Sequence, residues 1–221
     1  MVSRHPSAEW LVEYSSGSLS PAQAIATTTH IKFCSTCETM VDSLAHLGGT
    51  LLQECDSVPI SKGLLDHVLT SIETDFAPAE PKSELPAKVV DGIAAALPQY
   101  VRNFLPAGDL RWSFLSPSLR LATIGVGEAE FELALHRIKA GGQAPEHDHG
   151  GQEITVVLTG CFSDEEGIYQ PGDFMVRDAG DIHKPIAAQN EECICLSVLA
   201  APIKLTGFKR LLNPLLKFSP G

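Results

Sequence analysis

The chain has 221 residues, a hydrophobic content of 44% and a formal net charge of −11 at pH 7. These values are typical of a globular protein of one or two domains, and no apolar run reaches the roughly 18 residues that would span a bilayer. The acidic balance argues against direct binding of nucleic acid, which needs a basic surface, and suits a basic protein partner instead.

The beginning of the chain, MVSRHPSAEW, lacks the apolar core of a secretory signal. We therefore expect a cytoplasmic protein with no membrane partner. Six cysteines in that compartment are expected to be reduced thiols or metal ligands rather than a disulfide framework.

Two short helices are predicted first. Ser7 can cap a helix that runs through Tyr14, with Gly17 placed to end it. Ser20 and Pro21 then open a second helix, because proline is tolerated at the first helical position.

A third and a fourth helix are predicted from apolar residues at helical spacing. The third starts near Ser35, where Ser35 and Glu38 form a capping-box pattern, and the fourth is capped by Ser61. The two apolar stripes are Met40, Val41, Leu44, Leu47 and Leu51, and Leu64, Leu65, Val68, Leu69 and Ile72. Four short helices make only a small core, so we expect this part of the chain to need a metal ion as a staple.

The sequence HIKFCSTC offers ligands for such an ion. His30 and Cys34 are one helical turn apart, and Cys37 follows with CxxC spacing, which places two thiols and an imidazole within reach of one tetrahedral zinc ion. A bare CxxC can also be a redox pair. His5 is the candidate for the fourth ligand, because the first helix can pack its N-terminal end beside the next two. The competing candidates are Cys55, His46 and His67.

A proline-rich stretch separates the helices from the rest of the chain. Residues 76–86, FAPAEPKSELP, show no apolar periodicity and predict a stiff linker, and an alanine-rich helix can follow over residues 87–97. We expect a helical domain over residues 1–76, a linker over 77–95, and a second domain with a C-terminal tail over 96–221.

Short β-prone segments separated by Gly, Pro and Asp turns begin near Trp112. They are LRLATIG, EFELALHRI, EITVVLTG, DFMVRD and CICLSVL. Such spacing suits an antiparallel barrel. The predicted fold class is therefore a two-domain α+β protein, with a small zinc-binding four-helix domain followed by an antiparallel β-barrel.

The barrel region carries a second set of ligands. His147, His149 and Glu153 occupy odd-numbered positions, so in an extended strand their side chains point to the same side. His183 follows a glycine-bearing turn. Three imidazoles and one carboxylate are a good ligand set for zinc or another divalent transition metal.

The spacing of these residues resembles the two motifs of the cupin superfamily. The first motif is a glycine, five residues, HxH, three residues, Glu, six residues and a glycine, and it is matched by Gly141, His147, His149, Glu153 and Gly160. The second is matched by Gly172, Gly180 and His183. Asp178 and Ala187 replace the usual proline and asparagine, which affects a turn and the strand pairing but no ligand.

Other polar residues of this region are interpreted as structural. His136 alternates with apolar neighbours in its strand, and Cys193 and Cys195 share a strand face as small buried hydrophobes. Asp178 and Asp181 form a turn, and either can orient a metal ligand from behind.

The helical His-x3-Cys-x2-Cys pattern together with a C-terminal cupin resembles the zinc-dependent anti-sigma factors of the ChrR type. The resemblance includes His5, the pair Gly48-Gly49 and the CxCL stretch at Cys193. It implies that the helical domain binds an extracytoplasmic-function sigma factor in a 1:1 complex and blocks its access to RNA polymerase. It also implies that the cupin is needed to release the sigma factor under singlet oxygen or related oxidants.

Two other functions fit parts of the sequence. Cupins with this ligand set include dioxygenases and isomerases, so a cupin metalloenzyme is the main alternative to a regulatory protein. Some zinc modules with similar spacing bind DNA, but the net charge of −11 argues against that function.

Overall fold

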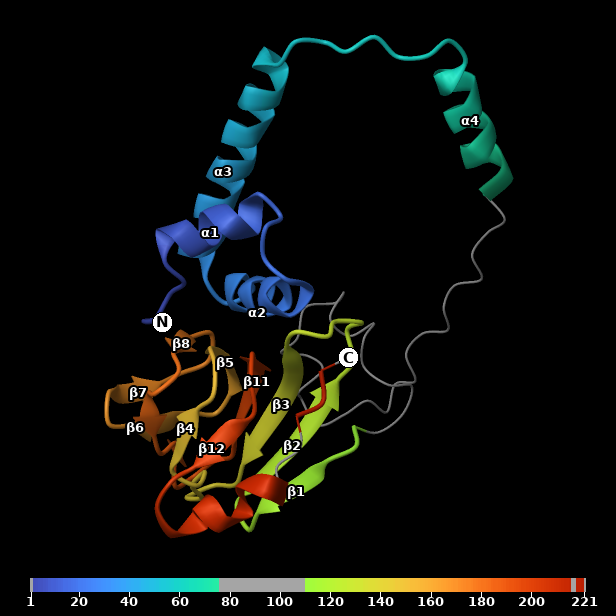
Figure 1. Ribbon diagram of the computed structural model, residues 1–221. Coiled ribbons are helices and arrows are strands. Elements are labelled where there is room, and N and C mark those ends of the chain that lie inside the picture. Colours follow the sequence, from blue (N-terminus) through green and yellow to red (C-terminus); the bar gives the residue numbers. More distant parts are fainter. Residues whose placement is uncertain (1, 76–109, 216–217, 221) are drawn as a thin grey trace.

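The computed structural model describes residues 2–75, 110–215 and 218–220 (Figure 1). The expected linker over residues 77–95 and the alanine-rich helix over 87–97 lie outside these ranges. Four helices come first, and nearly all of the later secondary-structure elements are strands, as predicted. The helices are α1 (Ala8–Ser15), α2 (Pro21–Ile31), α3 (Ser35–Glu54) and α4 (Leu64–Asp75).

The second half of the chain forms twelve strands and a closing 3₁₀ helix within the described residues. The strands are β1 (Ser113–Ser116), β2 (Leu119–Ile124), β3 (Glu132–Ile138), β4 (His147–His149), β5 (Glu153–Thr159), β6 (Phe162–Asp164), β7 (Gly167–Tyr169), β8 (Phe174–Arg177), β9 (Ile182–His183), β10 (Ile186–Ala187), β11 (Cys193–Leu199) and β12 (Ile203–Leu205). The 3₁₀ helix η1 spans Gly207–Leu215. The five β-prone segments of the sequence correspond to β2, β3, β5, β8 and β11.

The helix starts follow local hydrogen-bonding rules, with one departure from expectation. Ser7 caps α1 by accepting from the Trp10 N–H, and Ser20 forms a capping box with Gln23 at the start of α2. The prediction that Ser35 caps α3 is wrong: the cap is Cys34, whose sulfur accepts from the Cys37 N–H at 3.5 Å.

The helical part has a smaller core than four helices would give. A buried cluster joins α1 to α3 through Leu11, Cys34 and Cys37, and the Trp10 indole N–H donates to the Thr27 hydroxyl to join α1 to α2. By contrast, α4 lies away from the other helices (Figure 1) and exposes its apolar residues. The expected four-helix core therefore contains only the first three helices.

The strands form three antiparallel sheets. The largest has the order β1-β2-β3-β11-β5-β8, and two smaller sheets, β10-β6-β7 and β12-β4-β9, complete the barrel. Along β11, the side chains of Ile194 and Leu196 face out of the barrel, and those of Cys193 and Cys195 face inward. Both sides of β11 are buried, which explains its continuous apolar sequence.

Helix α2 covers the outer side of this large sheet (Figure 1). Ala22, Ile25 and Ala26 are at most 4% exposed and belong to one apolar cluster with residues of β5 and β11. Trp10 also packs here, with its ring 5.9 Å from that of Phe174. The helical part and the barrel thus share a core. Among the described residues, no helix is long and apolar enough to cross a bilayer.

Candidate metal centres

The ligands of the first centre converge at the junction between α2 and α3. His30 is in the last turn of α2, Cys34 precedes α3, and Cys37 is in its first turn. His5 comes from the extended segment before α1. One donor atom from each of these four residues lies within 4.8 Å of the donor atoms of the other three. The structure therefore brings together the set that the sequence predicted.

The spacing fits one tetrahedral ion. The Nδ1 atom of His5 lies 3.3 Å from the Cys34 sulfur and 3.5 Å from the Cys37 sulfur, and two ligand atoms of a tetrahedral zinc site are about 3.6 Å apart. The buried Nε2 atom of His30 has no hydrogen-bond partner. A buried nitrogen without a partner is costly, and a metal ion would satisfy it.

The protonation of the site is also suited to a cation. Burial, followed by the neighbouring Cys34 thiol, raises the pKa of Cys37 to about 12. Burial lowers the pKa of His30, which keeps its imidazole neutral and able to donate a lone pair. Both groups are therefore uncharged at neutral pH without a metal, and an ion that displaces the Cys37 proton would take its place.

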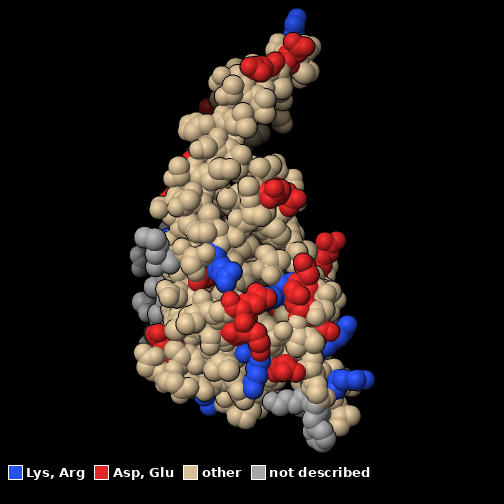
Figure 2. Space-filling view, turned by 90° about the vertical axis from the view of Figure 1, so that its left-hand side faces the viewer, with Lys and Arg blue, Asp and Glu red and all other residues tan. Residues whose placement is uncertain are grey.

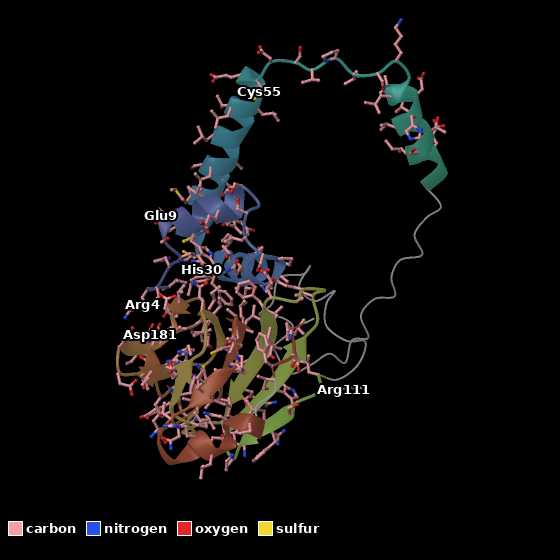
Figure 3. The ribbon with its side chains drawn as sticks, viewed as in Figure 1. Arg4, Glu9, His30, Cys55, Arg111 and Asp181 are labelled. Atoms are coloured by element: carbon pink, nitrogen blue, oxygen red, sulfur yellow. The ribbon has the colours of Figure 1, made fainter. Side chains whose placement is uncertain are left out.

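The competing fourth ligands are far from this cluster. Cys55 lies at the opposite end of α3 from His30 (Figure 3). His46 and His67 are exposed residues of α3 and α4. His5 is the fourth member of the group, as predicted, although its ring is exposed.

The second centre lies inside the barrel. His147 and His149 are the ends of β4, Glu153 begins β5, and His183 ends β9. Strands β4 and β9 pair so that His147 is opposite His183. The donor atoms of these four residues also lie within 4.8 Å of one another.

Each histidine of this centre is oriented by an oxygen atom behind it. The Nδ1 atoms of His147, His149 and His183 contact the Pro145 carbonyl at 2.8 Å, the Asp181 carbonyl at 2.7 Å and the Asp164 carboxylate at 3.1 Å. A carbonyl only accepts, so Nδ1 donates and Nε2 carries the lone pair. Asp181 thus orients a ligand, as the sequence analysis allowed, but through its backbone.

The inward-facing atoms need a cation. The Nε2 atoms of His147 and His183 lie 3.1 Å apart, and with both Nδ1 atoms protonated they face each other as two lone pairs. His149 Nε2 and Glu153 Oε2 are 2.7 Å apart, yet both are buried without a hydrogen bond. Burial lowers the pKa of His147 to about 4. A divalent ion would satisfy all four donors.

A polar network behind His183 was missed by the sequence analysis. The Asp164 carboxylate of β6 contacts His183 and accepts hydrogen bonds from Arg177 at 2.8 Å and from the Tyr169 hydroxyl at 3.0 Å. Arg177 also donates to the Tyr169 oxygen at 2.9 Å. These residues lie 5 to 19 positions apart on four different strands, so no local spacing pattern reveals them.

A cavity of about 390 Å³ adjoins this centre. His147, Glu153 and His183 line it together with mainly apolar residues, among them Met175 and Cys195. His136, interpreted as structural, also lines the cavity and contacts the Ser197 hydroxyl at 3.2 Å. The barrel interior therefore combines a candidate metal site with space for a small molecule.

The fold and the two candidate centres define a class of protein: a cupin barrel joined to a helical module with its own cluster of His and Cys side chains. Comparisons with known proteins agree. The family model described as the ChrR Cupin-like domain matches residues 104–201. The Anti-sigma-E factor ChrR of Cereibacter sphaeroides is 32% identical over 215 residues, which are 96% of this chain and 97% of that protein.

A solved structure leads to the same family. The crystal structure of Rhodobacter sphaeroides SigE in complex with the anti-sigma ChrR contains a chain with 31% identity and a TM-score of 0.71, covering 90% of this chain and 99% of that one. The present chain belongs to the ChrR family of anti-sigma factors. The predicted resemblance is thereby confirmed, and the regulatory class is favoured over the cupin metalloenzyme.

Proposed function

We propose that this protein is a zinc-dependent anti-sigma factor that binds one extracytoplasmic-function sigma factor in the cytoplasm. The observation that carries the proposal is family membership over nearly the whole chain, together with a His5, His30, Cys34 and Cys37 cluster whose geometry suits zinc. Residues 1–76 would bind the sigma factor, and residues 96–221 would form the domain that senses oxidants.

The exposed apolar faces of α3 and α4 support a protein partner. Within the described residues, these two helices expose Met40, Leu47, Leu51, Leu52, Leu64, Leu65, Val68, Leu69 and Ile72, each at least 39% accessible. Figure 2 shows few charges on the visible side of α3. A large exposed apolar surface marks an interaction site, and two amphipathic helices suit grooves on a partner.

The charge of the chain selects the kind of partner. Acidic side chains gather on the barrel side shown in Figure 2, and the formal net charge is −11. Such a field attracts a protein with basic surfaces, which sigma factors need to contact DNA, and it repels nucleic acid.

Co-purification with a co-expressed extracytoplasmic-function sigma factor tests the proposal. We expect a 1:1 complex that is lost when Cys34 and Cys37 are replaced by serine, because the α2–α3 junction then has no ion to stabilise it. Cys55→Ser is the matched control, since Cys55 is exposed at the far end of α3. A complex that survives the double substitution would contradict the zinc-dependent function.

Oxidant sensing is assigned to the barrel interior. The oxidisable side chains Met175 and Cys195 line the cavity beside the metal ligands, and the sulfur atoms of Cys193 and Cys195 are 3.7 Å apart. Replacing these three residues and Cys161 should abolish release of the sigma factor by singlet oxygen while leaving the complex intact. Normal release of the sigma factor from this variant would exclude oxidation of these side chains as the trigger.

A further inference from the structure

The first metal centre does not lie within the helical module alone. Its inner side rests against a turn of the barrel between β7 and β8, here called the docking turn (residues 170–174). In Figure 3, His30 and Arg4 both lie at this junction. Hydrogen bonds to the docking turn hold two of the four candidate ligands, His30 directly and His5 through the residues before it.

His30 is attached through its ring. Its Nδ1 atom lies 2.6 Å from the carbonyl oxygen of Gly172, and the histidine is 0% exposed. Because the carbonyl only accepts, Nδ1 must donate, which leaves the lone pair on Nε2, the atom without a hydrogen-bond partner. The docking turn therefore sets the tautomer and the ring orientation that metal binding requires.

His5 is attached through the backbone that precedes it. The fully buried carboxylate of Asp173 accepts from the N–H groups of Ser3 at 2.6 Å and Arg4 at 3.0 Å. The Phe174 N–H in turn donates to the Arg4 carbonyl at 3.0 Å. Hydrogen bonds from Ser3 and Arg4 to the barrel thus fix the segment that precedes the exposed ring of His5.

The approach of the two parts is close enough to constrain the sequence. A Cβ atom at Gly172 would lie 2.5 Å from Cβ of Phe33 and 2.6 Å from Cγ2 of Val2. Gly172 also has a φ of +93°, a conformation that favours glycine. The docking turn fits between the segments that carry His5 and His30.

The docking turn is continuous with the network behind the barrel centre. Strand β8 runs from Phe174 to Arg177, and Arg177 binds the Asp164 carboxylate that contacts His183. One short strand therefore connects the supports of both candidate metal centres.

We propose that the docking turn is a functional part of the first metal centre, so that metal binding by the helical module and docking of the barrel stabilise each other. The inference rests on the proposed zinc site. Linkage is reciprocal: a docked barrel tightens metal binding, and bound metal holds the barrel in place. A signal that moves β8 then weakens the metal centre to which the proposed sigma-binding module is attached.

Asp173→Asn in the full chain tests one direction. Both Asp173 oxygens accept hydrogen bonds from N–H groups. An asparagine amide would have to place its NH₂ group against one of these N–H groups, and that hydrogen bond would be lost. We expect zinc affinity at the first centre, measured by chelator competition, to fall by about 10–100-fold. The thiolate-to-cobalt absorption of the Co²⁺ form should shift as His5 is displaced.

Glu128→Gln is the matched control. Glu128 is a buried carboxylate of the barrel that also contacts the helical part, by accepting from the Ala22 N–H at 2.8 Å. It touches no residue of the metal cluster, and a glutamine oxygen can still accept. Unchanged zinc affinity in Asp173→Asn, or an equal loss in both variants, would overturn the proposal.

Hydrogen exchange in the Cys34→Ser/Cys37→Ser chain tests the other direction. The Phe174 N–H bonds across the junction to Arg4, whereas the Gly172 N–H bonds within the barrel to the Val157 carbonyl at 2.8 Å. Loss of the metal should speed exchange at Phe174 and leave Gly172 unchanged. Unchanged exchange at both amides, or equal acceleration at both, would overturn the proposal.

The experiments separate this inference from the function on which it rests. If the unsubstituted chain gave no thiolate-to-cobalt band, the zinc site itself would be wrong. If the unsubstituted chain bound zinc and the sigma factor normally, but Asp173→Asn had the same zinc affinity as Glu128→Gln, only the role of the docking turn would be wrong.

Discussion

Three histidines of the two candidate centres share one arrangement. In His30, His147 and His149, Nδ1 faces a backbone carbonyl, which leaves Nε2 for the metal. His183 differs, because its Nδ1 faces the carboxylate of Asp164. A carboxylate behind an imidazole makes the ring a stronger donor, so His183 is the ligand of the barrel centre most sensitive to its support.

Replacing Asp164 by asparagine should therefore weaken metal binding in the barrel. Burial acts to raise the pKa of Asp164, but hydrogen bonds from the Glu166 N–H, His183 and Tyr169 outweigh it and lower the pKa overall. The group is thus ionised behind His183. We expect a loss of about 10–100-fold in metal affinity, measured by competition with a chelator.

The control for that change is Asp148→Asn. Asp148 lies between the ligands His147 and His149, but its carboxylate points to the other side of β4 and accepts from the Gly180 N–H at 3.0 Å. An amide oxygen can replace it there. Equal effects of the two substitutions would mean that charge near the site, and not support of His183, determines affinity.

The candidate ligands could be predicted from the sequence, but apart from Asp181 their supports could not. His147, His149 and Glu153 are close in sequence and follow strand alternation. Asp164 and Arg177 support His183 from β6 and β8, and only the folded barrel brings those strands together. Local patterns therefore predict ligand identity, whereas long-range pairing decides which residues orient the ligands.

Zinc binding to the helical centre should release a proton and strengthen with pH. Burial and the Cys34 thiol raise the pKa of Cys37 to about 12, so this thiol is protonated at neutral pH when no metal is present. Zinc must displace this proton at any pH below that pKa, so zinc affinity should rise about tenfold per pH unit around neutral pH. Calorimetry in buffers of different ionisation enthalpy would measure the release, which Cys37→Ser should reduce. Affinity that is constant across neutral pH would contradict a thiolate ligand.

At the scale of the elements, α3 is divided along its length. Its first half packs against α1 through Val41 and Leu44, whereas its second half and α4 expose their apolar residues. The apolar stripe of α4 and the later part of the stripe of α3 are thus not directed toward an internal core. A pattern at helical spacing shows that a helix has an apolar face, but it does not tell whether the same chain or another molecule covers it.

Leu51→Lys should weaken sigma-factor binding without unfolding the chain. Leu51 is 56% exposed on α3, so the change removes apolar surface and adds a charge where a partner would pack. A central interface residue contributes more than about 1 kcal/mol, so affinity should fall at least about fivefold. Gln53→Lys, on the opposite side of the same helix turn, adds the same charge as a control. Equal binding by both variants would place the interface elsewhere.

The errors at this scale have local causes. Ser35 was expected to cap α3, but the preceding Cys34 accepts from the Cys37 N–H through its sulfur and occupies the cap instead. The shortest strands, such as β9 and β10, span two residues each. Two residues cannot show alternation, so these strands were not predicted, although β9 carries His183.

At the scale of the whole molecule, the helical part and the barrel are not independent. Ala22, Ile25 and Ala26 of α2 are buried against the large sheet, and the docking turn contacts the first metal centre. Separating the two parts would expose this apolar face of α2 and remove the hydrogen bond to His30. Sequence alone indicated two domains joined by a linker, and it gave no sign of this shared core.

Residues 1–76 alone should still inhibit the sigma factor, because the proposed interface on α3 and α4 lies within them. The fragment lacks the docking turn, so its zinc affinity should be lower than that of the full chain by about the same 10–100-fold factor as in Asp173→Asn. It should also fail to respond to singlet oxygen, since the barrel is absent. In vitro transcription and chelator competition on the same fragment would measure both properties. A fragment that folds but does not inhibit would contradict the division of labour, whereas one that binds zinc as tightly as the full chain would show that the barrel contributes nothing to the first centre.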